Sequence, residues 1–115
     1  MSSEAQLLAK VHLKWGAHPR VRLWRSNAGK LWAPTAGGGL RPVQVNVPGC
    51  PDLIGWVMVD GRAVFLGVET KSPTGALRDS QRAFQATLTR MGGLYIVARS
   101  VEDVDRVLEP LCQAA

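Results

Sequence analysis

The chain of 115 residues has little cysteine, little histidine and no long apolar run. Its two cysteines are too few for a disulfide scaffold, which favours a reducing compartment such as the cytoplasm. Its two histidines do not stand at metal-ligand spacing from either cysteine, which argues against zinc, and they form no convincing Ser-His-Asp set. No segment approaches the roughly 18 apolar residues of a membrane span, and the first residues lack the pattern of a secretory signal. We therefore expect no membrane partner.

The positive charge is concentrated at one end of the chain. Fourteen Lys and Arg against nine Asp and Glu give a net charge of +5. Glu4 is the only acid among the first 41 residues, whereas the last fifteen residues are acidic. A small basic domain suggests a polyanionic partner. The glycine run at 36–39 lacks the Gly-Lys-Ser/Thr ending of a phosphate-binding loop, and we expect no organic cofactor.

Hydrophobic spacing predicts one α/β domain over residues 1–115, with a central mixed sheet flanked by helices. The predicted order is α-β-β-β-α-β-α, and a further short strand is possible. The expected helices cover 3–15, 77–91 and the residues after Ser100, and the expected strands cover 20–26, 53–59, 63–71 and 94–98, with 43–47 as the short one. Residues 28–42 are rich in glycine and proline and predict a loop, read as a flexible flap or as disorder.

Asp60-Gly61 separates two apolar runs and predicts a tight hairpin turn. Asp52 lies eight residues before Asp60, and Glu69 lies eight residues after Gly61, so the simple register places the two carboxylates opposite each other. Lys71 shares a strand face with Glu69.

Two carboxylates are the ligands that Mg²⁺ commonly uses in proteins, and a nearby lysine can position water or offset charge on a phosphate. The backbone carbonyl of Thr70 could supply a further ligand. Hydrolysis of a phosphodiester suits these groups. The plain alternative is that Glu69 and Lys71 merely form a solvated strand face.

The order of these residues resembles that of a nuclease superfamily. Gly49-x-Pro51-Asp52 is followed by Glu69-x-Lys71, and Gln81 stands ten residues further on. This pattern resembles the PD-(D/E)xK nucleases and, within them, the virus-type replication-repair nuclease (VRR-NUC) family. The likeness covers residues 3–98, and it includes Glu4, the Arg25–Gly29 segment and Gly75.

The resemblance implies a restriction-endonuclease-like fold and a metal-dependent endonuclease acting on DNA, with four-way junctions or flaps as candidate substrates. Asp52 and Glu69 would bind Mg²⁺ or Mn²⁺, Lys71 would orient or activate the attacking water, and Gln81 would lie near the same site. Glu4 could hold a second metal ion or its water. The resemblance further implies a homodimer in the cytoplasm of a bacterial cell or of a phage-infected host.

Basic and aromatic residues alternate after the first predicted helix, a pattern typical of surfaces that bind phosphates and unstacked bases. The residues expected to contact nucleic acid are Arg22, Arg25, Asn27, Lys30 and Arg78, with Trp24 and Trp32 interleaved. Alternatively, these tryptophans are core or dimer contacts and the charges are solvated. Trp15 and Trp56 are predicted in the core.

The sequence is also compatible with two other functions. The chain could be a non-catalytic nucleic-acid-binding module of the same fold, although such a module has no need for Asp52, Glu69 and Lys71 together. It could also be a structural domain whose basic surface contacts an acidic protein.

Overall fold

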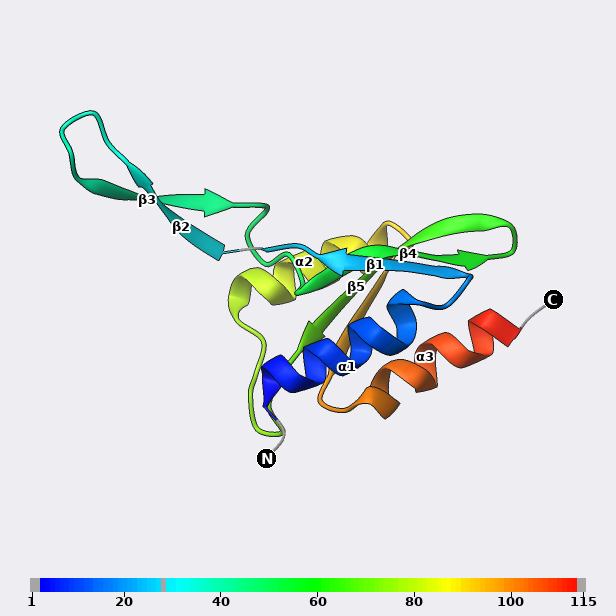
Figure 1. Cartoon of the computed structure of the whole chain (residues 1–115). Coiled ribbons are helices and arrows are strands. Elements are labelled where there is room, and N and C mark those ends of the chain that lie inside the picture. The colour runs from blue at the N-terminus through cyan, green and yellow to red at the C-terminus, as the bar shows by residue number, and fades with distance from the viewer. Residues whose placement is uncertain (1–2, 28, 114–115) are drawn as a thin grey trace.

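The computed structural model describes residues 3–27 and 29–113, and for residues 29, 30 and 45 it describes the backbone alone. Within these residues, three helices flank a four-stranded sheet, and a two-stranded hairpin projects from it (Figure 1). The elements are α1 (Glu4–Gly16), β1 (Val21–Arg25), β2 (Gly29–Pro34), β3 (Leu40–Val45), β4 (Leu53–Val59), β5 (Arg62–Thr70), α2 (Asp79–Arg90), β6 (Leu94–Ala98) and α3 (Val101–Gln113). The predicted mixed α/β architecture is confirmed, with β2 as an additional strand. No helix in the described part of the chain is long and apolar enough to span a bilayer.

The main sheet has the strand order β1-β4-β5-β6. The β1–β4 and β4–β5 pairs are antiparallel, whereas β6 lies parallel to β5 because α2 returns the chain to the starting end of the sheet. The turn between β4 and β5 has positive φ at both Asp60 (50°) and Gly61 (78°), as the sequence predicted. The register, with Val59 opposite Arg62, is also the predicted one.

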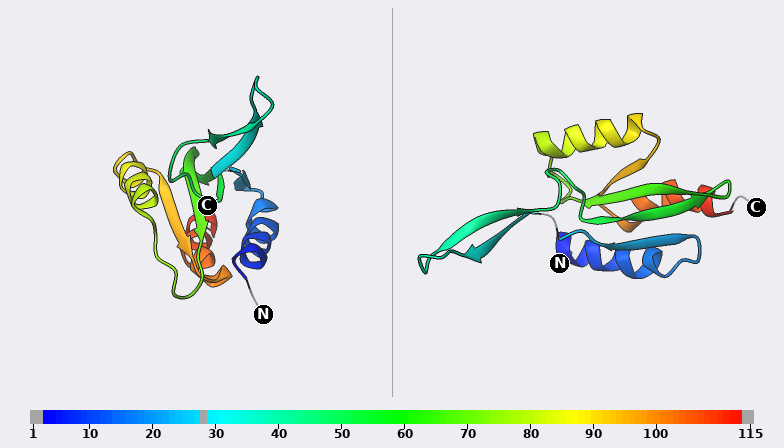
Figure 2. Two further views of the ribbon diagram at one scale, coloured as in Figure 1. Left: turned by 90° about the vertical axis from the view of Figure 1, so that its left-hand side faces the viewer. Right: turned by 90° about the horizontal axis from the view of Figure 1, so that it is seen from above.

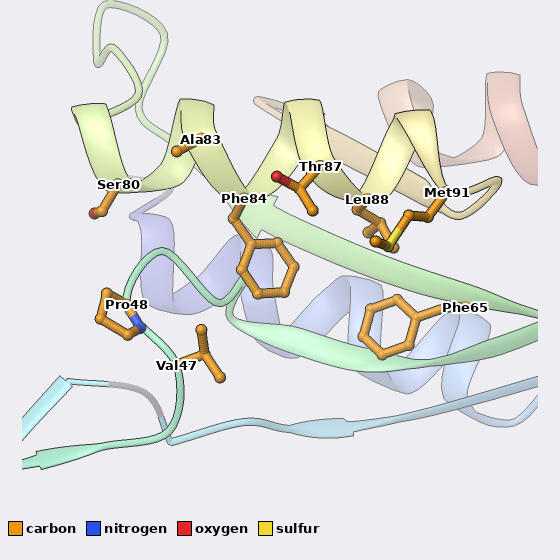
Figure 3. Close-up of a pocket in the computed structure, with 9 residues that line it drawn as sticks. All are labelled: Val47, Pro48, Phe65, Ser80, Ala83, Phe84, Thr87, Leu88 and Met91. Atoms are coloured by element: carbon orange, nitrogen blue, oxygen red, sulfur yellow. The ribbon is translucent and has the colours of Figure 1, made fainter.

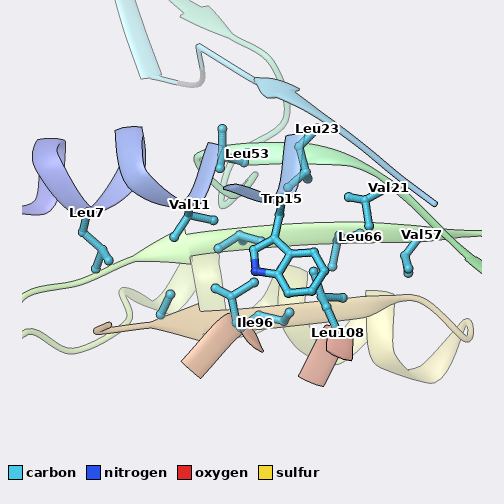
Figure 4. Packing of buried hydrophobic residues seen from close by; sticks show 13 residues of the cluster. Leu7, Val11, Trp15, Val21, Leu23, Leu53, Val57, Leu66, Ile96 and Leu108 are labelled. Atoms are coloured by element: carbon cyan, nitrogen blue, oxygen red, sulfur yellow. The ribbon is translucent and has the colours of Figure 1, made fainter. Parts of the chain in front are cut away.

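The hydrophobic core lies on one face of this sheet. The helices α1 and α3 cover that face, and α2 lies on the other side (Figure 2, left). Alternate residues of β4 point into the core, as the two-residue period of a strand requires. Figure 4 shows Trp15 of α1 among core side chains that include Leu66 of β5 and Leu108 of α3. The predicted burial of Trp15 is therefore confirmed.

The first helix begins as predicted. The hydroxyl of Ser3 accepts a hydrogen bond from the backbone N–H of Gln6 (3.1 Å), and the Gln6 side chain accepts one from the N–H of Ser3 (2.9 Å). This reciprocal pair satisfies two N–H groups that the first turn would leave unpaired. At the other end of α1, Lys14 and Trp15 both donate to Asp105 of α3, which ties the two core-covering helices together.

The predicted loop at 28–42 is wrong, because residues 29–45 form a β-hairpin, while residue 28 lies outside the described residues. Strands β2 and β3 pair in an antiparallel ladder from Gly29–Val45 to Pro34–Leu40, and the hairpin projects from the body (Figures 1 and 2). We call residues 29–45 the arm. Three of its four glycines, at 37–39, are gathered at its turn, where Gly38 has φ +88° and the Thr35 N–H donates to the Gly39 carbonyl (2.8 Å). Both strands are edge strands, which tolerate the missing N–H of proline.

The predicted burial of Trp56 is also wrong. Trp56 is 43 % exposed and lies on the sheet face opposite the main core. There it contacts Trp24 of β1 edge to face, with ring centroids 5.7 Å apart. The β4 run is apolar on both faces, so its composition did not reveal which residues the helices cover.

Candidate active site

The β4–β5 hairpin brings the two predicted carboxylates together. Its register, continued one residue beyond Leu53–Val68, places Asp52 opposite Glu69. The backbone N–H of Asp52 donates to Oε1 of Glu69 (3.2 Å). In turn, Oδ2 of Asp52 accepts hydrogen bonds from the backbone N–H and the hydroxyl of Thr70, each at 2.9 Å. Both carboxylates are thus fixed by neighbouring groups of the same hairpin.

Glu69 is a buried carboxylate with only 5 % of its surface exposed. Its Oε2 accepts a hydrogen bond from Nε2 of Gln81 (3.0 Å) and lies 3.8 Å from Nζ of Lys71. Burial, and after it the charge of Asp52, raises the pKa of Glu69 to about 7, against the opposing effect of Lys71. Two carboxylates that repel each other in this way favour a cation bound between them.

Gln81 connects the second helix to this pair. Its side chain is 2 % exposed, and its Oε1 accepts a hydrogen bond from the backbone N–H of Arg78 (2.8 Å). Because the amide oxygen binds the start of α2, the amide nitrogen is directed at Glu69. The first turn of α2 therefore orients the Glu69 carboxylate. The predicted helix at 77–91 contains this turn, although α2 itself begins at Asp79.

Gly49 allows the chain before Asp52 to lie against the start of α2. Its φ is +83°, and a Cβ at this position would lie 2.0 Å from the carbonyl oxygen of Ser80. No other residue fits such an approach without movement of the backbone. The glycine of the Gly49-x-Pro51-Asp52 motif is therefore explained by backbone packing.

Glu4 and Thr70 occupy different positions relative to the carboxylate pair. Oε1 of Glu4 accepts a hydrogen bond from the backbone N–H of Ser72 (2.8 Å), next to Lys71 in the chain. Among the described residues, no group of three His, Cys, Asp or Glu side chains comes together as a metal-binding cluster. The structure therefore brings Asp52 and Glu69 together and does not add Glu4 to them. Thr70 contacts Asp52 through its N–H and hydroxyl.

The carboxylate pair opens into a cleft of about 360 Å³. Asp52, Glu69, Arg78 and Gln81 line it, and Gln44 at the base of the arm contributes a further wall. The chemistry of this donor set fits a hard divalent cation, because carboxylate oxygens are the ligands that Mg²⁺ and Mn²⁺ prefer. Among the described residues, no hydrogen bond reaches Oδ1 of Asp52, which leaves it available to such an ion.

The residues expected to contact nucleic acid do not form one cluster. Arg78 lines the cleft, and Arg25 lies at the same end of the sheet, opposite Leu53. Asn27 follows with φ +53°. Arg22 lies further along β1, opposite Trp56. The side chain of Lys30 lies outside the described residues.

Sequence reasoning missed Tyr95. This residue of β6 lies opposite Gly67, on the same sheet face as Glu69. Its hydroxyl is buried and, within the described part of the chain, has no hydrogen-bond partner. Burial, followed by the charges of Glu69 and Asp52, raises the pKa of Tyr95 above its usual value. No motif marks Tyr95, because its position depends on how β6 pairs with β5.

Comparison with known proteins gave one family match. Residues 4–102 match the VRR-NUC domain, and this range covers most of the chain. Neither the curated proteins nor the solved structures gave a match. The matched range includes Asp52, Glu69, Lys71 and Gln81, and it agrees closely with the resemblance expected over residues 3–98. The chain belongs to the VRR-NUC domain family, whose members are nucleases of the PD-(D/E)xK type.

Proposed function

We propose that this protein is a metal-dependent endonuclease that hydrolyses phosphodiester bonds in DNA. The observation that supports this most directly is the pairing of half-buried Asp52 with buried Glu69, with Lys71 beside them and a cleft in front of them. A basic chain supplies the attraction for a polyanionic substrate. Membership of a nuclease family supports the same reaction.

Asp52 and Glu69 would hold Mg²⁺ or Mn²⁺, and the backbone carbonyl of Thr70 is a further candidate ligand. Such an ion polarises a phosphoryl oxygen and lowers the pKa of water that it binds. Glu4 is a candidate ligand for a second ion, because no hydrogen bond between described residues reaches its Oε2.

The remaining groups have roles that follow from their contacts. The ammonium of Lys71 lies next to Glu69, where it can orient the attacking water and offset the charge of the phosphate. Gln81 acts through Glu69, whose carboxylate it holds in place. Arg78 in the cleft, and Arg25 and Asn27 at the same end of the sheet, would contact the DNA backbone, with Arg22 further along β1. Lys30, whose side chain lies outside the described residues, is a candidate contact from the sequence alone.

We further propose that the protein is a homodimer, and the arm supports this. Three large apolar residues of the arm are 61–67 % exposed: Leu31, Trp32 and Leu40. A two-stranded hairpin alone is marginally stable in water, so an apolar arm of this kind gains stability by packing against another molecule. Two sites in one dimer would suit a four-way junction. Light scattering of the full chain tests this proposal, and a monomeric mass at micromolar concentration would contradict it.

The proposed reaction is tested by cleavage of a DNA panel in Mg²⁺ and in Mn²⁺. The panel contains linear single strands, linear duplexes, flaps and four-way junctions. We expect cleavage of at least one substrate, complete inhibition by excess EDTA, and the largest rate on a branched or flapped substrate. Activity that persists in EDTA would refute the metal role.

A binding module without catalysis is the second candidate, because no group of three or more His, Cys, Asp or Glu side chains that could hold a metal ion forms in the described part of the chain. In that case the protein would bind DNA with a steep salt dependence. No member of the panel would be cut in either metal, and the Asp52→Asn variant would bind as the wild type does.

A further inference from the structure

We propose that an apolar hollow beside the catalytic cleft binds one unstacked base of the DNA substrate, an inference that rests on the proposed nuclease function. The hollow has a volume of about 510 Å³ and lies between α2, β5 and the segment Val47–Pro48 (Figure 3). Its wall is formed mainly by Phe65, Phe84, Leu88 and Met91. This volume lies within the range of small-molecule sites, and a nucleobase is smaller than most of their ligands.

The hollow presents apolar and aromatic surface to solvent. Met91 is 75 % exposed and Phe65 is 40 % exposed. Phe84 is supported from behind by Tyr95, with ring centroids 6.1 Å apart. Figure 3 shows the rings of Phe65 and Phe84 extending into the space between the helix and the strand. Aromatic rings held in this way are the usual partners on which unpaired bases stack.

The hollow adjoins the catalytic cleft. Val47, Pro48 and Ser80 line both spaces. The contact of Gly49 with the Ser80 carbonyl fixes this shared wall against α2. A DNA strand with a phosphate at Asp52 and Glu69 therefore has a neighbouring nucleotide next to the hollow.

The chemistry of the hollow selects the base and not the phosphate. Its lining is mostly apolar, and no Arg or Lys lines it, among the described residues. The hydroxyls of Ser80 and Thr87 stand in its wall and take part in no hydrogen bond between described side chains, so they can bind the edge of a base. DNA offers an apolar, flat group of this kind only after the base leaves the stack, and this costs least where the base is already unpaired. The hollow therefore predicts a preference for substrates with unpaired nucleotides next to the cut.

The test combines abasic sites in the DNA with a substitution in the hollow, and it measures binding by the inactive Asp52→Asn chain in Mg²⁺. We call this comparison the binding cycle. A labelled flap substrate and versions with one abasic site at successive positions are titrated by fluorescence anisotropy. We expect one abasic position next to the scissile phosphate to weaken binding about 5- to 150-fold, the range of a lost base stack. Adding Phe84→Ala to this chain should weaken the binding of intact DNA by a similar factor. In this double variant, the abasic site at that position should cause no further loss of binding. Leu13→Ala, an exposed change on α1, should alter neither.

Several outcomes would overturn this inference. An equal loss of binding affinity at every abasic position would show that no base occupies the hollow. The same would follow if the loss caused by Phe84→Ala and the loss caused by the abasic site were additive. If Phe84→Ala unfolds the chain, Met91→Glu at the rim repeats the cycle. If the protein is a dimer and either variant makes it monomeric without changing the loss of binding at the abasic site, the hollow is a contact between two copies of the chain. Because the cycle measures binding, it is separate from the DNA panel, whose failure would refute catalysis alone.

Discussion

The side chain of Gln81 donates a hydrogen bond of 3.0 Å to Oε2 of Glu69, and this bond joins the first turn of α2 to the end of β5. The same amide accepts a hydrogen bond from the backbone N–H of Arg78 through its oxygen. One buried side chain therefore sets both where the helix begins and which way the carboxylate points. We therefore expect Gln81 to act on the proposed site by orienting Glu69.

This relationship predicts the effect of removing the amide. Gln81→Ala leaves Oε2 of Glu69 without its buried donor, so the carboxylate loses its fixed orientation. Groups that orient metal ligands typically contribute 10- to 100-fold in activity or metal affinity, and we expect a loss of about that size. Cleavage rates over a Mg²⁺ titration measure it. Thr89→Ala, an exposed change on the same helix, is the control, and equal rates for both variants would contradict the role.

The carboxylates themselves should be indispensable. Asp52→Asn and Glu69→Gln keep the shape of each side chain and remove the charge that would hold a divalent ion. Because such an ion stabilises the transition state by several kcal/mol, cleavage should fall by about a thousandfold or more. Asp79→Asn, at a side chain that is 95 % exposed on α2, should keep full activity. Circular dichroism must show that all three variants remain folded. Near wild-type cleavage by Asp52→Asn would refute the assignment.

Much of this site follows from local sequence rules. Asp60-Gly61 sets the turn, the turn sets the register, and the register places Asp52 opposite Glu69 without any knowledge of the rest of the chain. The position of Gln81 could be predicted only from its place in the family pattern. Its bond to Glu69 depends on how α2 packs, and packing is a long-range property that spacing does not contain.

The errors have a common physical origin. The 28–42 segment contains the glycines and prolines of a loop, but three of its four glycines sit in one turn and the prolines lie in edge strands, where they are tolerated. Trp56 looks like a core residue because composition indicates apolarity and not which sheet face a helix covers. The pairing of the arm strands and the exposure of Trp56 both depend on the tertiary arrangement of the chain.

A divalent ion should stabilise the folded chain through this pair. A ligand that binds only the native state at 100 times its Kd adds about 2.7 kcal/mol to the free energy of unfolding. We expect Mg²⁺ or Mn²⁺ to raise the melting temperature of the wild type in thermal unfolding. The rise should disappear in Asp52→Asn and in Glu69→Gln. An equal rise in all three proteins would place the ion elsewhere.

Gly49 offers a stability test with an internal control. Gly49→Ala adds a Cβ at positive φ and also places it 2.0 Å from the Ser80 carbonyl, whereas Gly38→Ala adds one at φ +88° with no atom within 4 Å. The Gly38 variant should lose only about 1 kcal/mol, the usual cost of the left-handed conformation. The Gly49 variant should lose clearly more, because the wall between the cleft and α2 must move, and its cleavage should fall. Urea unfolding measures both. Equal losses would show that the approach to Ser80 does not matter.

Asp103 predicts a pH dependence at the start of α3. Its carboxylate accepts hydrogen bonds from the backbone N–H groups of Arg99 (2.8 Å) and Ser100 (3.2 Å), and from the Arg106 side chain (2.9 Å). The backbone bond from Arg99, followed by the bond from Arg106, lowers the pKa of Asp103 below its usual value of 3.8. The unfolded chain therefore binds the proton more readily, and the stabilisation is complete above about pH 5 and is lost as the pH falls through the lowered value.

Asp103→Ala removes this cap, so at pH 7 it should lower the free energy of unfolding by about 1 kcal/mol. As the pH falls toward 2, the wild-type carboxyl takes up its proton and loses this stabilisation, so the difference between the two proteins should shrink. Urea unfolding at both pH values measures it. Glu102→Ala, an exposed acid in the same first turn, is the control and should show a smaller loss at pH 7. If the difference in free energy of unfolding between the wild type and Asp103→Ala does not change with pH, packing and not the charged carboxylate accounts for the loss.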